Sequence, residues 1–438
     1  MERTDIAIVG AGAAGLAAAR ALRGLGARVR ILEARDRAGG RILTHREPRV
    51  PLAIELGAEF VHGEAPETYR IVREAGLLTC DVTGEHWVAR NRALRRADFW
   101  EQIERVLRRI DRSAPDESFA QFLARRPGGR ALARGRQGAR EFVQGFHAAD
   151  VDQIGTHFVA LPDEDPGEVA EHSARIIEGQ ERIVRHLARG LAPAIRWRAT
   201  VSAIEWERGQ AELSIRSESG TTSRLRARAV IVSVPLGVLQ APAGEPGAIA
   251  FRPDPVPIRG ALGRLAMGSA MRMCVWFRDV PWAGLPGAPK GQDLGRLSFL
   301  HARGGPFNVW WTPYPIRFPL AVAWCGGPPA ARLGQMPRAA IESAAFGALA
   351  RQLGVSRRRV ESRVEKTWLH DWNGDPFSRG AYSYARVGGA GAAKTLARPV
   401  EGTLFFAGEA TDHERSGTVE GAIASGLRAA KQVERALR

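Results

Sequence analysis

Short apolar runs punctuated by glycine are the first pattern along this chain. Ile6–Val9 is short and rich in branched residues, which predicts a fully buried parallel strand. An Ala- and Leu-rich stretch with helical periodicity continues to Leu25, and Arg28–Leu32 predicts a second strand. Ala229–Val234 and Leu404–Phe406 repeat the buried-strand pattern far downstream. Because strands of this kind occur near both ends, we expect the two ends of the chain to close one discontinuous domain.

The other segments predict a mixture of strands and helices. Alternation of polar and apolar positions favours half-buried strands at Thr200–Trp206 and Glu212–Arg216. A second sheet is predicted from strands at Met271–Phe277, Phe307–Trp311 and Leu320–Trp324. Helical spacing predicts a mostly helical insertion over residues 80–175 and helices at Pro66–Leu78, Ile176–Leu191, Pro337–Leu353 and Thr418–Leu437.

The glycine turn after the first strand has the chemistry of a dinucleotide site. It reads Gly10-Ala11-Gly12-Ala13-Ala14-Gly15 and opens the first helix. Gly10 allows the tight turn, Gly12 lets the backbone approach a pyrophosphate, and Gly15 lets the helix pack closely on the strand. Glu33, at the end of the second strand, can accept hydrogen bonds from ribose hydroxyls. This fingerprint is typical of NAD and of FAD.

Two later segments extend this site. A second glycine turn runs through Gly39 and Gly40, and Arg35 and Arg41 on either side can neutralise a pyrophosphate. The segment Gly57-Ala58-Glu59-Phe60 begins with little side-chain bulk, which suits close approach to a flat ring. A simple tight turn is the alternative interpretation of that segment.

The predicted fold class is α/β, with a Rossmann-like domain and a second domain of α+β type. The cofactor domain comprises residues 1–78, 178–238 and 396–438. Residues 79–177 and 239–395 form a substrate domain with a mixed sheet and the helical insertion. Most of the 11 tryptophans follow Trp276. Large rigid aromatics often line substrate cavities, although core packing is the alternative for most of them.

Composition indicates an ordinary soluble protein. The 438 residues are 45% hydrophobic, and none of their segments offers the ~18 uninterrupted apolar residues of a membrane span. The first predicted strand begins close to Met1, so we expect no leader peptide and a cytoplasmic location. Cys80, Cys274 and Cys325 are scattered without metal-ligand spacing, so we predict no metal site.

The charge balance is strongly basic, with a formal net charge of +16. All but four of the 63 basic residues are arginines, and they are spread along the chain among many alanines. This distribution differs from the concentrated patch of a nucleic-acid site, so we do not expect nucleic acid as a partner. The acidic run Asp163–Asp165 can attract a polycation, or it is only a solvated loop.

Several motifs, in one order along nearly the whole chain, resemble those of the flavin-containing amine oxidase family. That family includes monoamine oxidases, polyamine oxidases and flavin-dependent histone lysine demethylases. The motifs are Glu33-Ala34-Arg35-x-x-x-Gly39-Gly40-Arg41, Gly57-Ala58, Val234-Pro235-Leu236-Gly237-Val238-Leu239, Gly380-Ala381-Tyr382-Ser383-Tyr384, Phe406-Ala407-Gly408-Glu409-Ala410-Thr411 and Gly417-Thr418-Val419-Glu420-Gly421-Ala422.

The resemblance implies FAD as the cofactor. It places Glu33 at the adenosine ribose, Val201 near adenine and Glu409 near the ribityl-phosphate region. Thr418 and Val419 would sit under the pyrimidine edge, where the positive end of a helix stabilises the negative charge of reduced flavin. The full set of implied FAD contacts is Gly10, Gly12, Ala14, Gly15, Glu33, Ala34, Arg35, Gly40, Arg41, Gly57, Ala58, Glu59, Phe60, Val201, Gly408, Glu409, Thr418 and Val419.

The reaction implied by the resemblance is oxidation of a carbon next to an amine nitrogen. Hydride passes to flavin N5, the imine hydrolyses, and dioxygen reoxidises the flavin to give hydrogen peroxide. The amine must be neutral, so an apolar, aromatic pocket is expected. Trp372 and Tyr382 are candidates for its walls. His62 is a candidate polar group at its mouth, with a structural histidine as the alternative.

Three positions depart from the family pattern. Ala381 stands where monoamine oxidases have a flavin-linked cysteine, so the FAD should be non-covalent. Thr418 replaces a second cage tyrosine, as in the demethylase branch. Arg272 aligns with the lysine that holds a water at flavin N5, and a planar guanidinium is a poor substitute for an ammonium there. Arg272 can instead pair with a substrate carboxylate or form a structural ion pair.

We therefore predict an FAD-dependent amine oxidase with a small-molecule amine as substrate, a polyamine being one candidate, and with O2 as the electron acceptor. One alternative keeps the flavin but changes the substrate, giving an amino-acid oxidase or a non-amine dehydrogenase or desaturase. A second alternative is a non-catalytic basic flavoprotein that serves as a scaffold for nucleic acid or a protein.

Overall fold

The computed structural model describes residues 2–24, 26–90, 93–96, 100–160, 173–280, 282 and 294–438. The acidic run Asp163–Asp165 lies outside the described residues. The chain forms two compact units: the first comprises Met1–Thr79, Ile176–Met267 and Gly374–Arg438, and the second comprises Cys80–Arg175 and Gly268–Asn373. The sequence-based division stays a prediction, and it assigns residues 79, 176–177, 239–267 and 374–395 of this first unit to the substrate domain.

A five-stranded sheet of buried strands organises the first unit. Its order is β11-β3-β2-β15-β24, and the pairs β11–β3, β3–β2, β2–β15 and β15–β24 are all parallel. The strands are β2 (Ile6–Val9), β3 (Val29–Leu32), β11 (Ile195–Arg196), β15 (Ala229–Val232) and β24 (Leu404–Phe406). This confirms the predicted sheet that draws strands from both ends of the chain.

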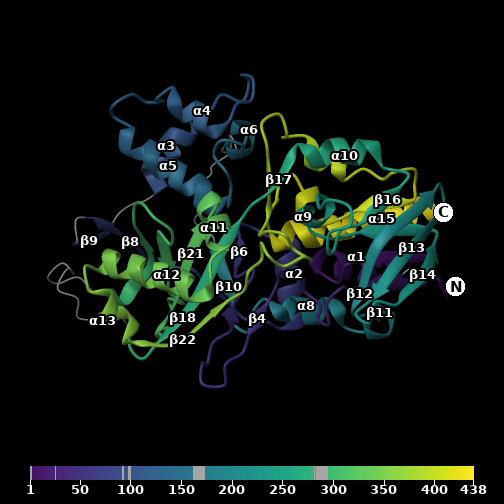
Figure 1. Ribbon diagram of the computed structural model, residues 1–438, viewed down its shortest axis with the longest axis horizontal. Coiled ribbons are helices and arrows are strands. Elements are labelled where there is room, and N and C mark those ends of the chain that lie inside the picture. Colours follow the sequence, from purple (N-terminus) through teal and green to yellow (C-terminus); the bar gives the residue numbers. More distant parts are fainter. Residues whose placement is uncertain are drawn as a thin grey trace. The chain divides into compact units, whose positions relative to one another are not determined.

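Two helices from opposite ends of the chain pack together in this unit. They are α1 (Ala13–Arg23) and α15 (Val419–Leu437), the purple and yellow helices of Figure 1. A Cβ on Gly426 would lie 2.2 Å from the carbonyl oxygen of Ala14, so the two backbones approach as closely as only glycine allows. Helices α2 (Pro66–Ala75) and α8 (Glu181–Ala188) contact each other in the same unit.

The predicted helix Ile176–Leu191 is wrong in its first part. Strand β10 (Ser173–Ile176) ends where that helix was expected to begin, and α8 starts only at Glu181. The reason is Gly179, whose φ of +90° is incompatible with a right-handed helix.

A second sheet of the first unit has the order β1-β14-β13-β12-β16. It confirms the strands predicted from Thr200 to Arg216. Its strands are β1 (Glu2–Arg3), β12 (Ala199–Glu207), β13 (Gln210–Ser217), β14 (Thr222–Ala227) and β16 (Ala250–Arg252). Shorter elements complete the unit: β4 (Thr44–His45), β5 (Ile54–Glu55), β6 (Phe60–His62), α9 (Leu236–Leu239), α10 (Val256–Gly263), β17 (Leu265–Met267), β23 (Ser383–Ala385) and α14 (Ala392–Leu396).

The second unit is built on a seven-stranded sheet with the order β22-β18-β21-β20-β19-β8-β9. The strands are β8 (Glu85–Arg90), β9 (Ala93–Arg96), β18 (Ala270–Phe277), β19 (Leu297–His301), β20 (Val309–Trp311), β21 (Leu320–Gly326) and β22 (Val364–Leu369). Met271, Met273 and Trp310 on this sheet join one core with residues of α11 (Pro328–Leu333) and α12 (Arg338–Leu353). The predicted second sheet is therefore confirmed.

The prediction of a mostly helical insertion over residues 80–175 is only partly right. The described part of that range contains four helices: α3 (Trp100–Leu107), α4 (Phe119–Ala124), α5 (Ala133–Phe146) and α6 (Thr156–Val159). The insertion also contributes β8 and β9 to the sheet, and β7 (Thr79–Asp81) precedes them. Strand β8 pairs with β19, about 200 residues later in the chain, and this non-local pairing buries Trp87. Helical spacing over a few residues does not reveal such a partner.

Helix α13 (Arg357–Glu361) completes the second unit. None of the described helices is both long enough and apolar enough to cross a membrane.

Candidate functional site

The first glycine turn has the geometry that its sequence predicts. Gly10 has a φ of +104°, which glycine adopts without strain. A Cβ on Gly15 would lie 2.0 Å from the carbonyl oxygen of Gly10, so no other residue fits there. A Cβ on Gly12 would meet none of the described protein atoms within 4 Å. Gly12 therefore borders open space at the N-terminus of α1, a cradle that suits a phosphate.

The second glycine turn lies directly on the first. The N–H of Gly39 donates to the carbonyl of Ala11 at 2.9 Å, and Gly40 approaches the Cα of Gly12. Arg37, which the sequence interpretation missed, braces this turn, and burial lowers the pKa of its guanidinium, with a smaller effect from the charge of Arg35. It donates to the carbonyls of Ala38, Gly40 and Ile42.

Glu33 joins the end of β3 to the glycine turn. Its carboxylate is buried and accepts from the N–H of Ala11 at 2.7 Å and from the N–H of Arg35 at 2.9 Å. Each carboxylate oxygen has a second lone pair, so ribose hydroxyls can still be bound. Val201 lies nearby on β12, because the N–H of Ala199, the first residue of that strand, donates to the carbonyl of Glu33 at 2.8 Å.

Arg35 is held by residues that no sequence spacing connects to it. Its Nη2 donates to both carboxylate oxygens of Asp375, at 2.8 and 2.9 Å, and to the hydroxyl of Ser378 at 2.9 Å. The guanidinium also lies over the ring of Phe377. Because Asp375 neutralises it, Arg35 orients this segment and contributes little net charge to a pyrophosphate. Arg41 takes a different partner, described below.

The small residues at Gly57-Ala58 have a steric reason within the protein. A Cβ on Gly57 would lie 1.9 Å from the carbonyl oxygen of Arg41, and the N–H of Ala58 donates to the same carbonyl at 3.2 Å. Gly57 is therefore required by the approach of two backbones. Glu59 and Phe60 follow it, and the backbone carbonyl of Glu59 accepts from the side chain of Gln180.

The Glu409 carboxylate connects three segments of the first unit. Arg41 Nη1 donates to it at 2.9 Å, the hydroxyl of Ser383 at 2.6 Å and the N–H of Gly417 at 3.0 Å. Arg41 also donates to the carbonyl of Ala381 at 2.6 Å. The preceding Gly408, with a φ of +122°, directs the chain out of β24. Buried Glu409 thus fixes the motifs that lie far apart in the sequence against one another.

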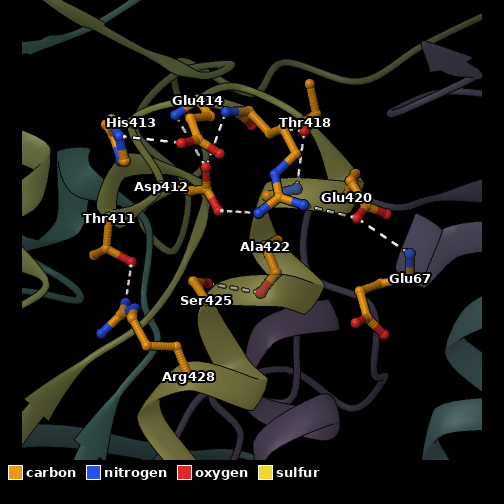
Figure 2. A network of polar contacts seen from close by, with 12 residues as sticks. Glu67, Thr411, Asp412, His413, Glu414, Thr418, Glu420, Ala422, Ser425 and Arg428 are labelled. Carbon is orange, nitrogen blue, oxygen red and sulfur yellow. Dashed lines mark hydrogen bonds and ion pairs between the residues drawn. The ribbon is translucent and has the colours of Figure 1, made fainter. Parts of the chain in front are cut away.

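Tyr382 contacts Gly417 in the folded chain, and Thr418 follows Gly417 in the sequence. A Cβ on Gly417 would lie 3.3 Å from Cδ2 of Tyr382, so the ring packs on that glycine. The Thr418 hydroxyl accepts from the N–H of Gly421 at 2.9 Å and donates to the carbonyl of Arg415 at 2.6 Å. Thr418 is therefore the N-cap of α15, as Figure 2 shows, and Val419 is the first helical residue.

His62 and Tyr382 are both neutral near pH 7. Burial lowers the pKa of His62 to about 4, against a smaller opposing effect of the Glu59 charge. Burial, with a smaller contribution from the charge of Glu409, raises the pKa of Tyr382 above its usual range. Neither side chain therefore adds a charge that would favour the ammonium form of an amine.

We expect the Tyr382→Phe variant to keep the wild-type pH dependence of flavin reduction between about pH 6 and pH 10. The raised pKa keeps the phenol protonated across this interval, so its ionisation contributes no limb to the profile. Stopped-flow reduction by a fixed amine at several pH values checks this. An alkaline limb that is present in the wild type and absent from the variant would contradict it.

Two of the predicted site residues belong to the second unit. Arg272 on β18 is 6% exposed, and its guanidinium lies over the Trp311 ring at 5.4 Å. Strand register pairs Arg272 with Trp324, so these side chains share one face of the sheet. Trp372 is buried and lies 4.0 Å, centroid to centroid, from the ring of His370. The glycine turns, Glu33, Glu409, Tyr382 and Thr418 belong to the first unit.

Comparison with known proteins decides the family. The model of the flavin containing amine oxidoreductases matches residues 13–99 and 80–434. The chain belongs to this family. Its cofactor is accordingly FAD, and the open cradle at Gly12, the lone pairs of Glu33 and the start of α15 fit such a group. For the described residues, no cluster of three or more metal-ligating side chains competes with this assignment.

The curated relatives include lysine-specific histone demethylase homologues and polyamine oxidases. The chain is 26% identical over 453 residues to lysine-specific histone demethylase 1 homolog 2 of Oryza sativa subsp. japonica, covering 98% of this chain and 57% of that protein. It is 27% identical over 468 residues to polyamine oxidase 4 of the same organism, covering 98% of this chain and 88% of that protein. The chain thus spans little more than half the length of the demethylase homologue.

Solved structures share the fold of this chain. Putrescine oxidase bound to putrescine superposes with a TM-score of 0.80 at 20% identity, with 99% of each chain covered. Cyclohexylamine oxidase from Brevibacterium oxydans IH-35A superposes with a TM-score of 0.79 at 20% identity, with 99% of this chain and 100% of that chain covered. These likenesses confirm the predicted Rossmann-like FAD domain with a substrate domain.

Proposed function

We propose that this chain is an FAD-dependent amine oxidase that oxidises the carbon next to the nitrogen of a small-molecule amine. In the net reaction, the amine, water and dioxygen give a carbonyl compound, the released amine or ammonia, and hydrogen peroxide. The observation that carries the proposal is the convergence of both glycine turns, Glu33, Glu409 and the start of α15 in one unit. Family membership supports the same chemistry.

When bound, FAD supplies the acceptor for the hydride and returns the electrons to dioxygen. The chain's own residues would hold it: Gly12 would admit the pyrophosphate, Glu33 would receive the ribose hydroxyls, and the N-terminus of α15 would stabilise negative charge on the pyrimidine edge. Ala381 provides no thiol, so the cofactor is held without a covalent bond through that position. The N–H groups at the start of α15 favour the charge that develops on reduction.

The protein side of the reaction is exclusion of charge and water from the amine. An amine must lose its proton before it can release hydride, and an apolar environment lowers its pKa. His62 and Tyr382 are neutral and add no charge of their own to that environment. Tyr382 is proposed as an aromatic wall beside the amine. The amine is already neutral when hydride leaves its α-carbon, so we assign no protein base to that step, and water hydrolyses the imine afterwards.

A polyamine is the proposed substrate class. The curated relative with the larger matched share of its own length is a polyamine oxidase, and a structure with the same fold holds putrescine.

Arg272 stands where the family has a lysine, and its guanidinium lies over the ring of Trp311. Slow reaction with dioxygen is therefore expected, because a guanidinium holds a water less compactly than an ammonium.

The experiment that tests the proposal is peroxide release in air from the FAD-loaded protein. Polyamines, monoamines, amino acids and alcohols are supplied separately. Peroxide with polyamines supports the proposal, and peroxide with amino acids alone assigns the substrate to a different amine class. No peroxide with any amine, together with binding to DNA that weakens steeply with salt, would favour the scaffold alternative.

A further inference from the structure

The start of α15 is flanked by two buried carboxylates, each paired with an arginine. Glu409 lies before the helix and pairs with Arg41 at 2.9 Å. Glu420 lies in the first turn of the helix and pairs with Arg415 at 3.2 Å. Both glutamate side chains are about 5% exposed. At this helix end, the proposed function uses the Thr418 cap and the backbone N–H groups. It gives no role to the charges of Glu420 and Arg415.

The Glu420 carboxylate is directed away from its own helix. It accepts from the N–H and the hydroxyl of Thr68, both at 2.8 Å, and from the N–H of Glu67 at 3.2 Å. Ala65, which precedes α2, offers no side-chain cap, so Glu420 supplies the missing cap from another helix. Figure 2 shows Glu420 between the start of α15 and Glu67.

Arg415 bridges two acids at this point. Its Nη1 donates to Glu420 at 3.2 Å and its Nη2 to Asp412 at 3.4 Å. Asp412 in turn accepts from the N–H groups of Glu414 and Arg415, at 3.1 and 2.9 Å. The loop before α15 is thus held by the same acidic and basic groups that surround the helix end. Removing Arg415 leaves two carboxylates without their cation, and removing either acid leaves Arg415 with one carboxylate in place of two.

Charges at this place act on whatever binds the helix end. Reduction of FAD adds negative charge at its pyrimidine edge, which the start of α15 is proposed to face. A nearby carboxylate that lacks its arginine opposes that charge, and an arginine that lacks its carboxylate favours it. Glu420 is buried at 5% exposure, so solvent screens its charge less than that of a surface carboxylate, whereas the Arg415 side chain is 36% exposed.

We infer that Arg415 and Glu420 are positioning residues that set the reduction potential of the bound FAD, with Arg415 raising it and Glu420 lowering it. This rests on the proposed placement of FAD. It assigns a function to an ion pair that the reaction itself does not use. The balance of the two charges keeps the potential in a range where an amine can reduce the flavin and dioxygen can reoxidise it.

The test is the midpoint potential of the bound FAD, measured against reference dyes. Glu420→Gln keeps an oxygen that can accept from Thr68 and leaves Arg415 with less compensation, so the potential should rise. Arg415→Gln leaves Glu420 uncompensated, so the potential should fall. Each change should shift the reduction equilibrium by between about twofold and thirtyfold, the range produced by charges at a helix N-terminus. The double variant should return close to the wild-type value.

A matched control lies at the other end of the same helix. Arg438 pairs with Glu434 on the surface, about 30 Å from Thr418 at 1.5 Å per residue. This distance exceeds the screening length of about 8–10 Å, so Arg438→Gln should leave the potential unchanged. If Arg415→Gln or Glu420→Gln loses its FAD, Asp412→Asn provides another variant, and its midpoint potential should rise.

The outcomes separate this inference from the proposed function. Opposite shifts in the two single variants support it. Unchanged potentials, or shifts of the same sign, overturn it and leave amine oxidation untouched, because a displaced helix would move both variants in one direction. If the wild-type protein binds FAD but no amine reduces that FAD, the proposed function is contradicted instead. Opposite shifts of the midpoint potential in the two single variants would then still support the inference about Arg415 and Glu420.

Discussion

Replacing Gly15 with alanine is expected to yield a protein that does not retain FAD and is strongly destabilised. The added Cβ would lie 2.0 Å from the carbonyl oxygen of Gly10, and both atoms belong to the backbone of the turn. Neither can move without separating α1 from β2, so the change costs about 3 kcal/mol or more of the free energy of unfolding. FAD content after purification and the thermal midpoint measure both effects.

Gly12→Ala is the matched control for that variant. Gly12 has an extended backbone with a φ of −74°, and its Cβ would meet none of the described atoms within 4 Å. Alanine should therefore change the stability of the FAD-free protein by less than about 1 kcal/mol. The methyl group occupies the space proposed for the phosphates, so FAD affinity should fall at least about tenfold, or about 1.4 kcal/mol. Full FAD affinity in Gly12→Ala would contradict the placement of the pyrophosphate.

Replacing Glu409 with alanine is expected to have the second large effect. The carboxylate receives Arg41, Ser383 and Gly417, and its removal leaves a partly buried guanidinium and two donors without their acceptor. Loss of one partner of a buried ion pair costs about 3–5 kcal/mol. We expect a fall of this size in the free energy of unfolding, measured by urea titration, together with loss of FAD.

Glu434→Ala is the matched control, because it removes a carboxylate from a more exposed ion pair on α15. Glu434 pairs with Arg438 near the C-terminus of α15, where both side chains are more exposed. Removal of such a pair changes stability by about 1 kcal/mol at most. Equal effects of the two substitutions would show that Glu409 does not connect the motifs as described.

Local patterns predicted the parts of the molecule that local chemistry determines. Ile6–Val9, Gly10 and Glu33 appear where a strand, a turn and an acid were expected, because each is specified by its immediate neighbours. Gly57 was predicted as a small residue for a flat ring, yet its nearest obstacle is the Arg41 carbonyl. The pattern showed that space was limited without showing what limits it.

Long-range partners were beyond these patterns. Asp375 binds Arg35 from 340 residues away, and Glu420 caps α2 across 352 residues. Strand β8 was read as part of a helical insertion because its partner β19 comes far later in the chain. In each case the deciding contact joins segments whose proximity exists only in the folded chain. Arg37 was missed for another reason, since an arginine that braces its own turn resembles any surface arginine.

The central claim is that amines reduce the FAD held by this chain. Its most direct test is to mix the FAD-loaded protein with polyamines, monoamines and amino acids without oxygen and to follow the absorbance of oxidised flavin. We expect a polyamine to bleach the flavin and admission of air to restore the absorbance with release of peroxide. Oxidised flavin that persists with every amine would contradict the proposed function.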